Sequence, residues 1–259
     1  MKRVLRFVFF FFGILVVLAV ASLVGLYLTA SSGLPDTGEL AARDFSRITL
    51  EAMRDDPQLR RLFPDTTLFL PKEAVPEHLS RAFLAAEDSS FYERERPSFV
   101  SAMQRLWRRL TASGVIFDCG SSISGQVART ILPAGRNYER QMKLAVLTFQ
   151  LERDLDRTDL LYIHLHQVYL GNHAYGVEEG AFAYFGKSAD ELSLAESAIL
   201  ASLSSAPSRV NPYTFPERAK ERQVYVLGRM LRLGWIGKEE YDAAVGQALL
   251  YENALARQN

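Results

Sequence analysis

The chain has 259 residues, with 30 basic and 30 acidic side chains, so its formal net charge is zero. This length accommodates one domain of about 200 residues with a full hydrophobic core, besides a membrane anchor. The balanced charge gives no reason to expect nucleic acid or another polyanion as a partner. The single cysteine, Cys119, excludes an intramolecular disulfide and a CxxC metal site. His164 and His166 lie two positions apart, which on a helix turns them to different faces, so a histidine metal site is not expected.

The first predicted element is a transmembrane helix over residues 7–28. This run carries no charge and is rich in Phe, Leu and Val, and about 20 apolar residues cross the hydrocarbon core of a bilayer. Three basic residues precede it, which predicts a cytoplasmic tail over residues 1–6 and the body of the protein on the far side of the membrane. A cleavable signal peptide is the alternative, because AVA at residues 19–21 has the small-x-small form of a cleavage site. The apolar run continues past that point, which favours a retained anchor.

The rest of the chain predicts an all-α domain. Residues 29–69 are interpreted as a juxtamembrane linker and lead-in, because residues 31–45 are polar and broken by Gly and Pro. Beyond them apolar residues recur at helical spacing, without the alternation of strands or a fixed-period repeat. Helices are predicted from Pro76 to Glu87, from Arg140 to Arg153, and from a cap at Asp156 or Thr158 through Leu165. Two more are predicted, one that starts at a capping box of Ser193 and Glu196 and one that runs from Pro216 to near Gly234.

Residues 99–112 predict a basic amphipathic helix. Apolar residues form one stripe along it, three arginines lie away from that stripe, and Trp107 lies beside it. Such a helix is a candidate for lying on an anionic membrane. The alternative is an ordinary helix whose stripe packs in the core and whose arginines are solvated.

Three segments, in order, resemble the motifs of the peptidoglycan glycosyltransferases, or murein polymerases. EDSSF at residues 87–91 resembles their opening motif, E-D-x-x-F. GSSISGQVAR at residues 120–129 is similar to the second motif, G-S-T-I-T-Q-Q-L-A-K. Residues 150–213 track a long family stretch, from Q-L-E-R through Y-F-G-K to A-P-S-x-Y-N-P-Y, almost residue for residue. The resemblance covers residues 70–245 and leaves residues 246–259 as a C-terminal tail.

The resemblance implies a lysozyme-like helical domain held at the outer face of the bacterial cytoplasmic membrane. Its substrate would be lipid II, the undecaprenyl-pyrophosphoryl disaccharide-pentapeptide, and its product a nascent glycan strand. The chain has no S-x-x-K and no K-T-G motif, so it resembles the monofunctional polymerases without a transpeptidase domain. Transpeptidases or other cell-wall synthesis proteins are therefore expected partners.

Polymerisation needs a base for the 4-hydroxyl of the acceptor sugar and positive charge for the departing pyrophosphate. By resemblance the base is Glu87, with Asp88 and Phe91 in supporting positions. Glu87 follows an apolar stretch at a helix end, where partial desolvation is expected to raise its pKa. The residues expected to bind the pyrophosphate are Ser122, Gln126 and Arg129 of the second motif, Arg140 at the start of the third motif R-K-x-x-E, and Lys143 on the same helix face as Arg140.

Several motif positions depart from the family. Arg94 and Arg96 stand where the opening motif has a histidine and a glycine, and Gly125 replaces the first glutamine of the second motif. Leu144 replaces the glutamate that ends R-K-x-x-E. In the family that glutamate belongs to the catalytic pair and is associated with a divalent metal, Mg or Mn. Leucine binds no metal and accepts no hydrogen bond.

These departures leave three hypotheses. In the first, the chain is a polymerase in which Arg94 and Arg96 neutralise the pyrophosphate in place of metal and carboxylate. In the second, the domain is catalytically impaired and binds lipid II or scaffolds the cell-wall synthesis machinery. In the third, it is a lysozyme-like lytic enzyme. The retained basic positions disfavour the third, because glycan cleavage has no pyrophosphate leaving group.

Overall fold

The computed structural model describes residues 2–45, 48–63, 66–95, 122–135, 137–249 and 251. Within these residues the regular elements are helices, and the pairing of Tyr169 with Tyr175 is an isolated bridge. The predicted all-α fold is confirmed for this part of the chain. Arg96 and the helix predicted over residues 99–112 lie outside the described residues. The helices are α1 (Lys2–Ser31), α2 (Thr37–Ala41), α3 (Leu50–Asp55), α4 (Pro57–Leu62), η2 (Lys72–Ala74), α5 (Glu77–Glu87), α7 (Ile123–Ile131), α8 (Tyr138–Asp154), α9 (Arg157–Gln167), α10 (Gly176–Phe185), η3 (Ala189–Glu191), α11 (Leu194–Leu203), α12 (Pro216–Arg232) and α13 (Lys238–Gly246).

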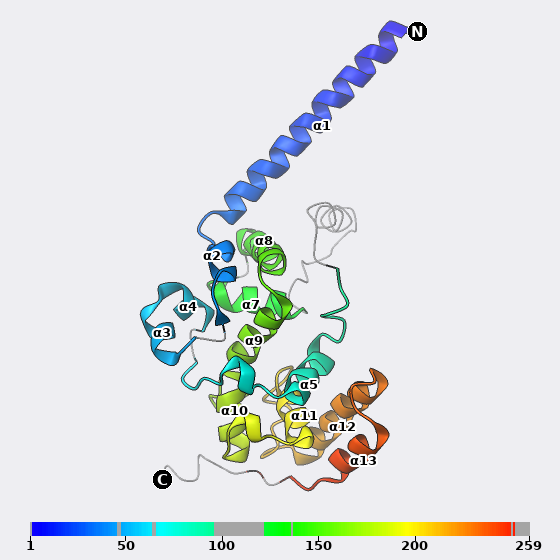
Figure 1. Cartoon of the computed structure of the whole chain (residues 1–259). Coiled ribbons are helices and arrows are strands. Elements are labelled where there is room, and N and C mark those ends of the chain that lie inside the picture. The colour runs from blue at the N-terminus through cyan, green and yellow to red at the C-terminus, as the bar shows by residue number, and fades with distance from the viewer. Residues whose placement is uncertain are drawn as a thin grey trace.

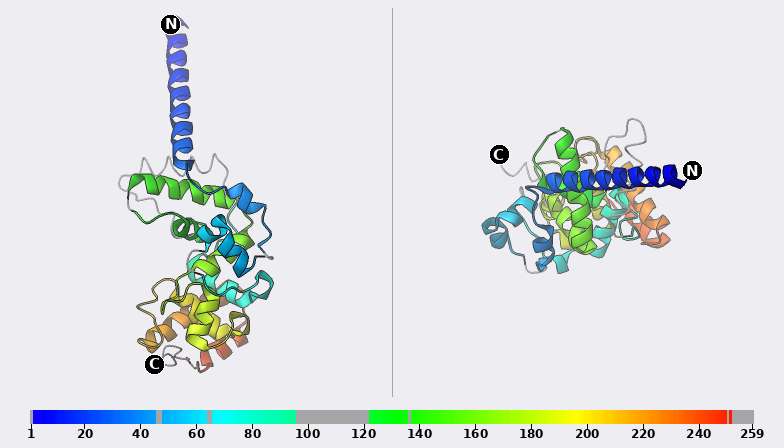
Figure 2. Two further views of the ribbon diagram at one scale, coloured as in Figure 1. Left: turned by 90° about the vertical axis from the view of Figure 1, so that its left-hand side faces the viewer. Right: turned by 90° about the horizontal axis from the view of Figure 1, so that it is seen from above.

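The first helix, α1, projects away from the helical body (Figure 1). In a second direction of view, α8 lies across the end of α1 (Figure 2). The two helices are joined there by Gln150, whose side-chain amide donates a hydrogen bond to the Tyr27 hydroxyl at 3.1 Å. In the described part of the chain, no helix combines the length and the hydropathy that a membrane crossing needs. The predicted transmembrane helix over residues 7–28 therefore stays a prediction.

The segment after α1, interpreted from the sequence as a linker, adds three short helices and several side chains to the core. Asp36 begins α2 by accepting hydrogen bonds from two backbone N–H groups of its first turn, as an N-cap residue does. Leu40 and Phe45 are buried in the main hydrophobic cluster. The Thr37 hydroxyl donates to Asp154 Oδ2 at 2.5 Å, which ties α2 to the end of α8. The body of the protein thus begins well before the first motif.

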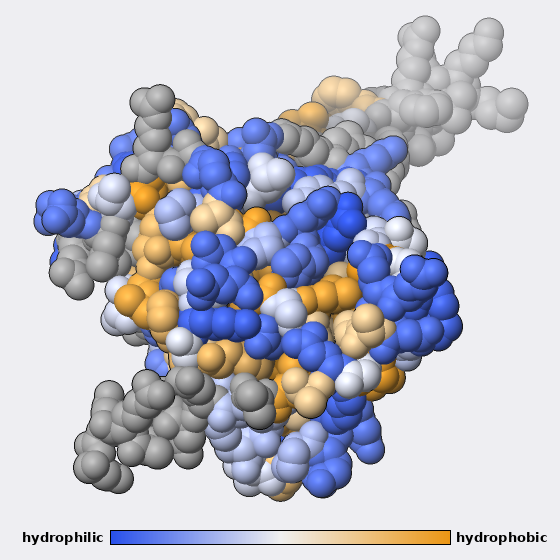
Figure 3. Space-filling model, turned by 60° about the horizontal axis from the view of Figure 1, so that its bottom comes forward, coloured by the Kyte–Doolittle hydropathy of each residue, from blue (hydrophilic) through white to orange (hydrophobic). Residues whose placement is uncertain are grey.

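The core is built around α11, in which every residue from Ala195 to Leu203 is buried. A helix that is apolar on all sides is stable only when other helices surround it, and here α5, α10, α12 and α13 pack against α11. The predicted capping box starts this helix: Ser193 accepts from the Glu196 N–H, and Glu196 accepts from the Ser193 N–H at 2.7 Å. Hydrophilic residues cover much of the face shown in Figure 3, with smaller apolar patches between them.

The other predicted helices are confirmed, with boundaries shifted by a few residues at most. The helix predicted from Pro76 is α5, and the one predicted over residues 140–153 is α8. Asp156 is the N-cap residue of α9, although its side chain makes no capping hydrogen bond. The last long helix, α12, ends two residues before Gly234, whose φ of +68° is one that glycine adopts without strain.

A tight reversal between α9 and α10 places two tyrosines beside the later site. The Gly176 N–H donates to the Val168 carbonyl at 2.8 Å, and Tyr169 and Tyr175 face each other with ring centroids 4.9 Å apart. Gly176 has φ +82°, and a Cβ at this position would lie 2.9 Å from the His166 carbonyl oxygen. Only glycine therefore fits this close approach of the reversal to α9.

Candidate active site

Glu87 is the last residue of α5, and its side chain points into the protein with 6% of its surface exposed. Its Oε2 atom accepts a hydrogen bond from the side-chain amide of Gln126, on α7, at 2.6 Å. His164 of α9 lies on the same side, with Nε2 3.1 Å from Oε2. The other carboxylate oxygen, Oε1, is buried and accepts no hydrogen bond from any described residue. Glu87 is thus held on one oxygen and left unpaired on the other.

The contact between Glu87 and His164 is close but not aligned as a hydrogen bond, because Nε2 of His164 is among the buried atoms without a hydrogen-bond partner. It is therefore an ion pair when the imidazole is protonated. Burial raises the pKa of Glu87, but the positive charge that His164 can carry and the polar groups of His164, Ser204 and Gln126 outweigh burial and leave the pKa below its usual value. The Ser204 hydroxyl has one proton, which it donates to the Ala201 carbonyl at 2.9 Å unless it turns to Glu87. The raised pKa expected from the sequence is wrong, because that expectation took no account of the polar side chains that surround the buried carboxylate.

Asp88, the neighbour of Glu87 in sequence, has a different set of partners. Both of its oxygens accept hydrogen bonds from the guanidinium of Arg94, at 2.8 and 2.7 Å, and Oδ2 also accepts from the Ile123 N–H at 3.2 Å. Phe91 is buried below this pair, with the Arg94 guanidinium 5.9 Å from its ring centroid. Asp88 therefore joins the end of α5 to the start of α7. Both terminal nitrogens of Arg94 are engaged in this clamp.

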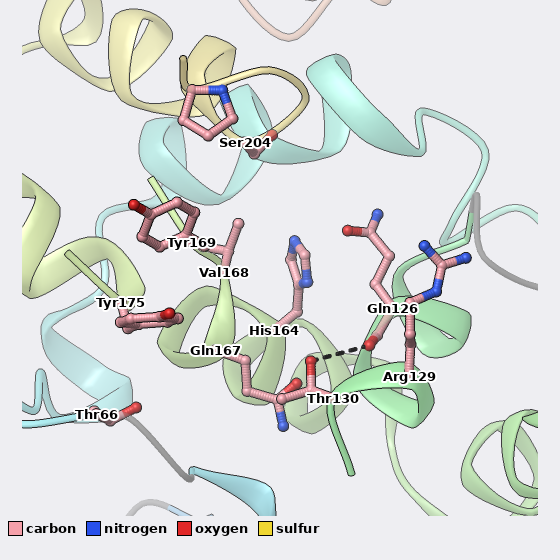
Figure 4. Close-up of a pocket in the computed structure, with 11 residues that line it drawn as sticks. Thr66, Gln126, Arg129, Thr130, His164, Gln167, Val168, Tyr169, Tyr175 and Ser204 are labelled. Atoms are coloured by element: carbon pink, nitrogen blue, oxygen red, sulfur yellow. Dashed lines mark hydrogen bonds between the residues drawn. The ribbon is translucent and has the colours of Figure 1, made fainter. Parts of the chain in front are cut away.

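One face of α7 carries three polar side chains toward the same space. Gln126, Arg129 and Thr130 are three and four residues apart, the spacing that puts side chains on one side of a helix (Figure 4). The Thr130 hydroxyl donates back to the Gln126 carbonyl at 3.3 Å. Ser122 does not join them, because its hydroxyl caps α7 by accepting from the Gly125 N–H at 3.1 Å.

This face lines a cavity of about 280 Å³. Arg129 and Gln126 lie on one side of it in Figure 4, and the two tyrosines of the reversal lie on the other. Glu87 is not itself a lining residue, but its three polar partners are, so they stand between the carboxylate and the open space. The lining residues are Thr66, Gln126, Arg129, Thr130, His164, Gln167, Val168, Tyr169, Tyr175, Ser204 and Pro207.

The remaining residues predicted to bind pyrophosphate lie elsewhere. The Arg140 guanidinium donates to the carbonyls of Pro133 and Arg129, at 2.6 and 3.4 Å, and so holds the connection between α7 and α8. Lys143 forms an ion pair of 2.8 Å with Glu139, one turn earlier on α8. Of the predicted pyrophosphate ligands that the structure describes, Gln126 and Arg129 line the cavity, while Ser122, Arg140, Lys143 and Arg94 do not.

Leu144, at the position where the resemblance implies a metal-associated glutamate, is 2% exposed and belongs to the hydrophobic core. The described residues include no group of three His, Cys, Asp or Glu side chains placed to hold a metal. Among the described side chains that contact the Glu87 carboxylate, His164 is of a metal-ligand type, and its Nε2 faces the carboxylate. Leu144 offers no ligand and His164 faces the carboxylate, so we assign no step of the reaction to a metal.

Sequence reasoning missed His164, Ser204 and the tyrosine pair as site residues. His164 lies within a run of apolar residues on α9, and it is 77 positions away from Glu87 in the sequence. A polar residue facing the core side of a helix is a signal that it has a buried partner, but the signal does not identify that partner. Tyr169 and Tyr175 are brought together by the glycine-containing reversal.

Comparisons with known proteins define the class of molecule. The family model for transglycosylases matches residues 58–231. A predicted transglycosylase of Cupriavidus necator is 37% identical over 203 residues, which cover 77% of this chain and 87% of that protein. The chain therefore belongs to the peptidoglycan glycosyltransferase family, and its domain is of the glycosyltransferase class.

Longer relatives contain a similar segment. Penicillin-binding protein 1A of Pseudomonas aeruginosa is 35% identical over 249 residues, which cover 95% of this chain and 30% of that protein. The chain thus spans less than a third of the length of this relative. The crystal structure of penicillin-binding protein 1A from Haemophilus influenzae matches 74% of this chain and 20% of that chain, with 27% identity and a TM-score of 0.41.

Proposed function

We propose that this chain polymerises lipid II into glycan strands at the outer face of the bacterial cytoplasmic membrane, with Glu87 as the general base. The observation that carries the proposal is the buried carboxylate of Glu87, held by Gln126 next to a cavity that Arg129 also lines. A general base must be fixed within reach of the proton it removes, and the Gln126 hydrogen bond fixes this one. Family membership supplies the reaction class.

The reaction would proceed as a single displacement. The 4-hydroxyl oxygen of the acceptor sugar attacks the anomeric carbon of the donor, whose bond to the lipid pyrophosphate breaks, and the pyrophosphate leaves with the electron pair. The hydroxyl proton passes to Oε1 of Glu87, the oxygen without a partner among the described residues, and later to solvent. Because Gln126, His164 and Ser204 stand between Glu87 and the cavity, the hydroxyl reaches Oε1 only when one of these side chains turns aside. Arg129 would stabilise the charge of the leaving pyrophosphate.

The membrane anchor over residues 7–28 belongs to the same proposal. Its support is the uncharged apolar sequence of this run and the exposure of its apolar side chains, such as Phe10 at 65% and Val17 at 67%. An anchored domain would meet its lipid-linked substrate at the bilayer surface. Membrane fractions should retain the full chain after a carbonate wash, and release by the wash would contradict a spanning helix.

Turnover of labelled lipid II by the purified full chain in detergent tests the proposal. Wild type should produce long glycan chains that lysozyme digests, and Glu87→Gln should produce none. Polymerisation that is unaffected by Glu87→Gln would remove Glu87 from the chemistry. Release of soluble muropeptides from isolated sacculi would instead identify a lytic enzyme.

A catalytically impaired, lipid II-binding protein is the second candidate, and Leu144 favours it. The resemblance places a carboxylate at this position, and the structure has a buried leucine there. Binding of lipid II without turnover, together with complementation of a deletion strain by Glu87→Gln, would establish this function instead of polymerisation.

A further inference from the structure

Two helices end at the buried pair of Glu87 and His164. Glu87 is the last residue of α5, and His164 lies in the last turn of α9. The C-terminal end of a helix carries a partial negative charge, which disfavours a carboxylate and favours a cation. The end of α5 therefore opposes ionisation of Glu87, and a cation beside the carboxylate would offset that effect. The arrangement makes the carboxylate depend on a nearby cation.

The other groups around Glu87 do not provide that cation. Gln126 from α7 and Ser204 from the end of α11 are neutral. Arg129 lines the cavity but makes no described contact with the Glu87 carboxylate. The neighbouring charged groups are also committed elsewhere: Asp88 is paired with Arg94, and Arg229 of α12 donates to the Ser89 hydroxyl at 2.8 Å.

We propose that His164 is a positioning residue for Glu87: as an imidazolium it keeps the carboxylate ionised and fixed on its Oε2 side, which leaves Oε1 for the proton of the acceptor hydroxyl. The inference rests on the proposed function of Glu87. Its geometric basis is the 3.1 Å separation of Nε2 from Oε2 between two side chains that are 2% and 6% exposed. At this burial a charge is costly unless an opposite charge lies beside it.

The pair has a consequence for the acid side of the pH profile. A carboxylate beside a cation stays ionised to lower pH, because the positive charge disfavours its protonation. Removing the charge of His164 should therefore move the loss of activity at acid pH to higher pH. A side chain that only fills space would leave the position of this limb unchanged.

The test is a titration of Glu87 in the full chain with carboxyl-¹³C-labelled glutamate, read by NMR and assigned by Glu87→Gln. In wild type the titration midpoint should lie below the ordinary value for glutamate. In His164→Gln, which keeps a donor but loses the charge, it should rise by about one to two pH units. The acid limb of kcat/KM for lipid II should move by the same amount, with activity at alkaline pH retained.

His166→Gln is the matched control. This second buried histidine of α9 bonds to Tyr162 and Leu70 and has no described contact with Glu87. It should leave the Glu87 midpoint where it is in wild type. A wild-type midpoint at or above the ordinary value, or an equal rise in both variants, would overturn the inference. If His164→Gln does not fold, a wild-type midpoint at or above the ordinary value still overturns the inference.

The two proposals fail separately. If the Glu87 midpoint is low and rises in His164→Gln, but the chain never polymerises lipid II, the positioning role of His164 stands and the proposed function is rejected. If polymerisation depends on Glu87, but the titration midpoint of Glu87 is the same in wild type and in His164→Gln, the proposed function stands and the positioning role is rejected.

Discussion

Two regions of the molecule meet at Glu87 and use their polar side chains differently. In the buried bundle, which we define as α9 to α12, His166 and Gln223 point inward and bond to backbone carbonyls at 2.9 Å. In the cationic pair, defined as the two helices α7 and α8, the basic side chains lie nearer the surface. Arg129 is exposed there, and Lys143 pairs with a residue of its own helix. The bundle fixes the shape of the site, and the cationic pair supplies charge that a ligand can reach.

The difference shows that a motif position does not determine how its side chain is used. Arg129 and Arg140 both match basic motif positions, yet only Arg129 lines the cavity, because Arg140 is bonded to backbone carbonyls. Glu87 draws on both regions, with His164 from the bundle and Gln126 from the cationic pair. Substitutions in each region should therefore have effects of different kinds.

The largest effect is expected at the junction itself. Glu87→Gln keeps the shape of the side chain but removes the base, so kcat/KM for lipid II should fall by about 10³-fold. The rate of glycan formation measures this, and far-UV circular dichroism should show the helical content of wild type. A variant that is inactive because it has unfolded would show lower helicity, and it would leave the role of the carboxylate to the Glu87 titration.

In the buried bundle, Gly176→Ala should be strongly destabilising. A Cβ at this position meets the His166 backbone at 2.9 to 3.1 Å, and the φ of +82° adds strain, so we expect a loss of about 3 kcal/mol in the free energy of unfolding. Urea denaturation measures it. Gly234→Ala is the matched control, since Gly234 has φ +68° but no atom within 4 Å of a Cβ, and it should lose only about 1 kcal/mol. Equal losses would mean that the reversal has room to move.

The same contrast explains what the sequence could predict. Helices came from local signals, such as the capping box of Ser193 and Glu196 and the proline that begins α12, and these signals act within a few residues. The motif resemblance singled out Glu87 and Gln126, and the structure places their side chains 2.6 Å apart. His164 was missed because its partner is distant in sequence. The use of Arg140 was missed because it depends on where the chain between α7 and α8 turns.

Within the bundle, stability should depend on pH through His166. Burial lowers the pKa of His166 to about 4 from the usual 6.5, and Nδ1 donates to the Tyr162 carbonyl, so the folded ring is neutral. Between these pH values the unfolded chain binds a proton that the folded chain does not. The free energy of unfolding should therefore fall as pH drops from 6.5 to 4, by up to about 3 kcal/mol from this residue.

Urea denaturation at pH 7 and pH 4.5 isolates this contribution when variants are compared. His166→Gln cannot take up the proton, so its stability should differ less between the two pH values than that of wild type. His173→Asn, at an exposed position with φ +59° that asparagine tolerates, should keep the wild-type difference. An unchanged difference in His166→Gln would mean that acid destabilises the fold through its carboxylates instead.

In the cationic pair, the expected effects are smaller and fall on activity. Arg129→Ala should lower kcat/KM for lipid II by roughly ten- to a hundredfold, because an exposed cation stabilises the leaving pyrophosphate less than a buried one would. Arg140→Ala removes hydrogen bonds to the Pro133 and Arg129 carbonyls, so it should cost about 1 kcal/mol of stability and change kcat/KM less. Inorganic pyrophosphate should inhibit wild type more strongly than Arg129→Ala. If both variants lose activity equally, or if pyrophosphate inhibition is independent of Arg129, then the leaving group binds outside this cavity and the cationic pair acts only as scaffold.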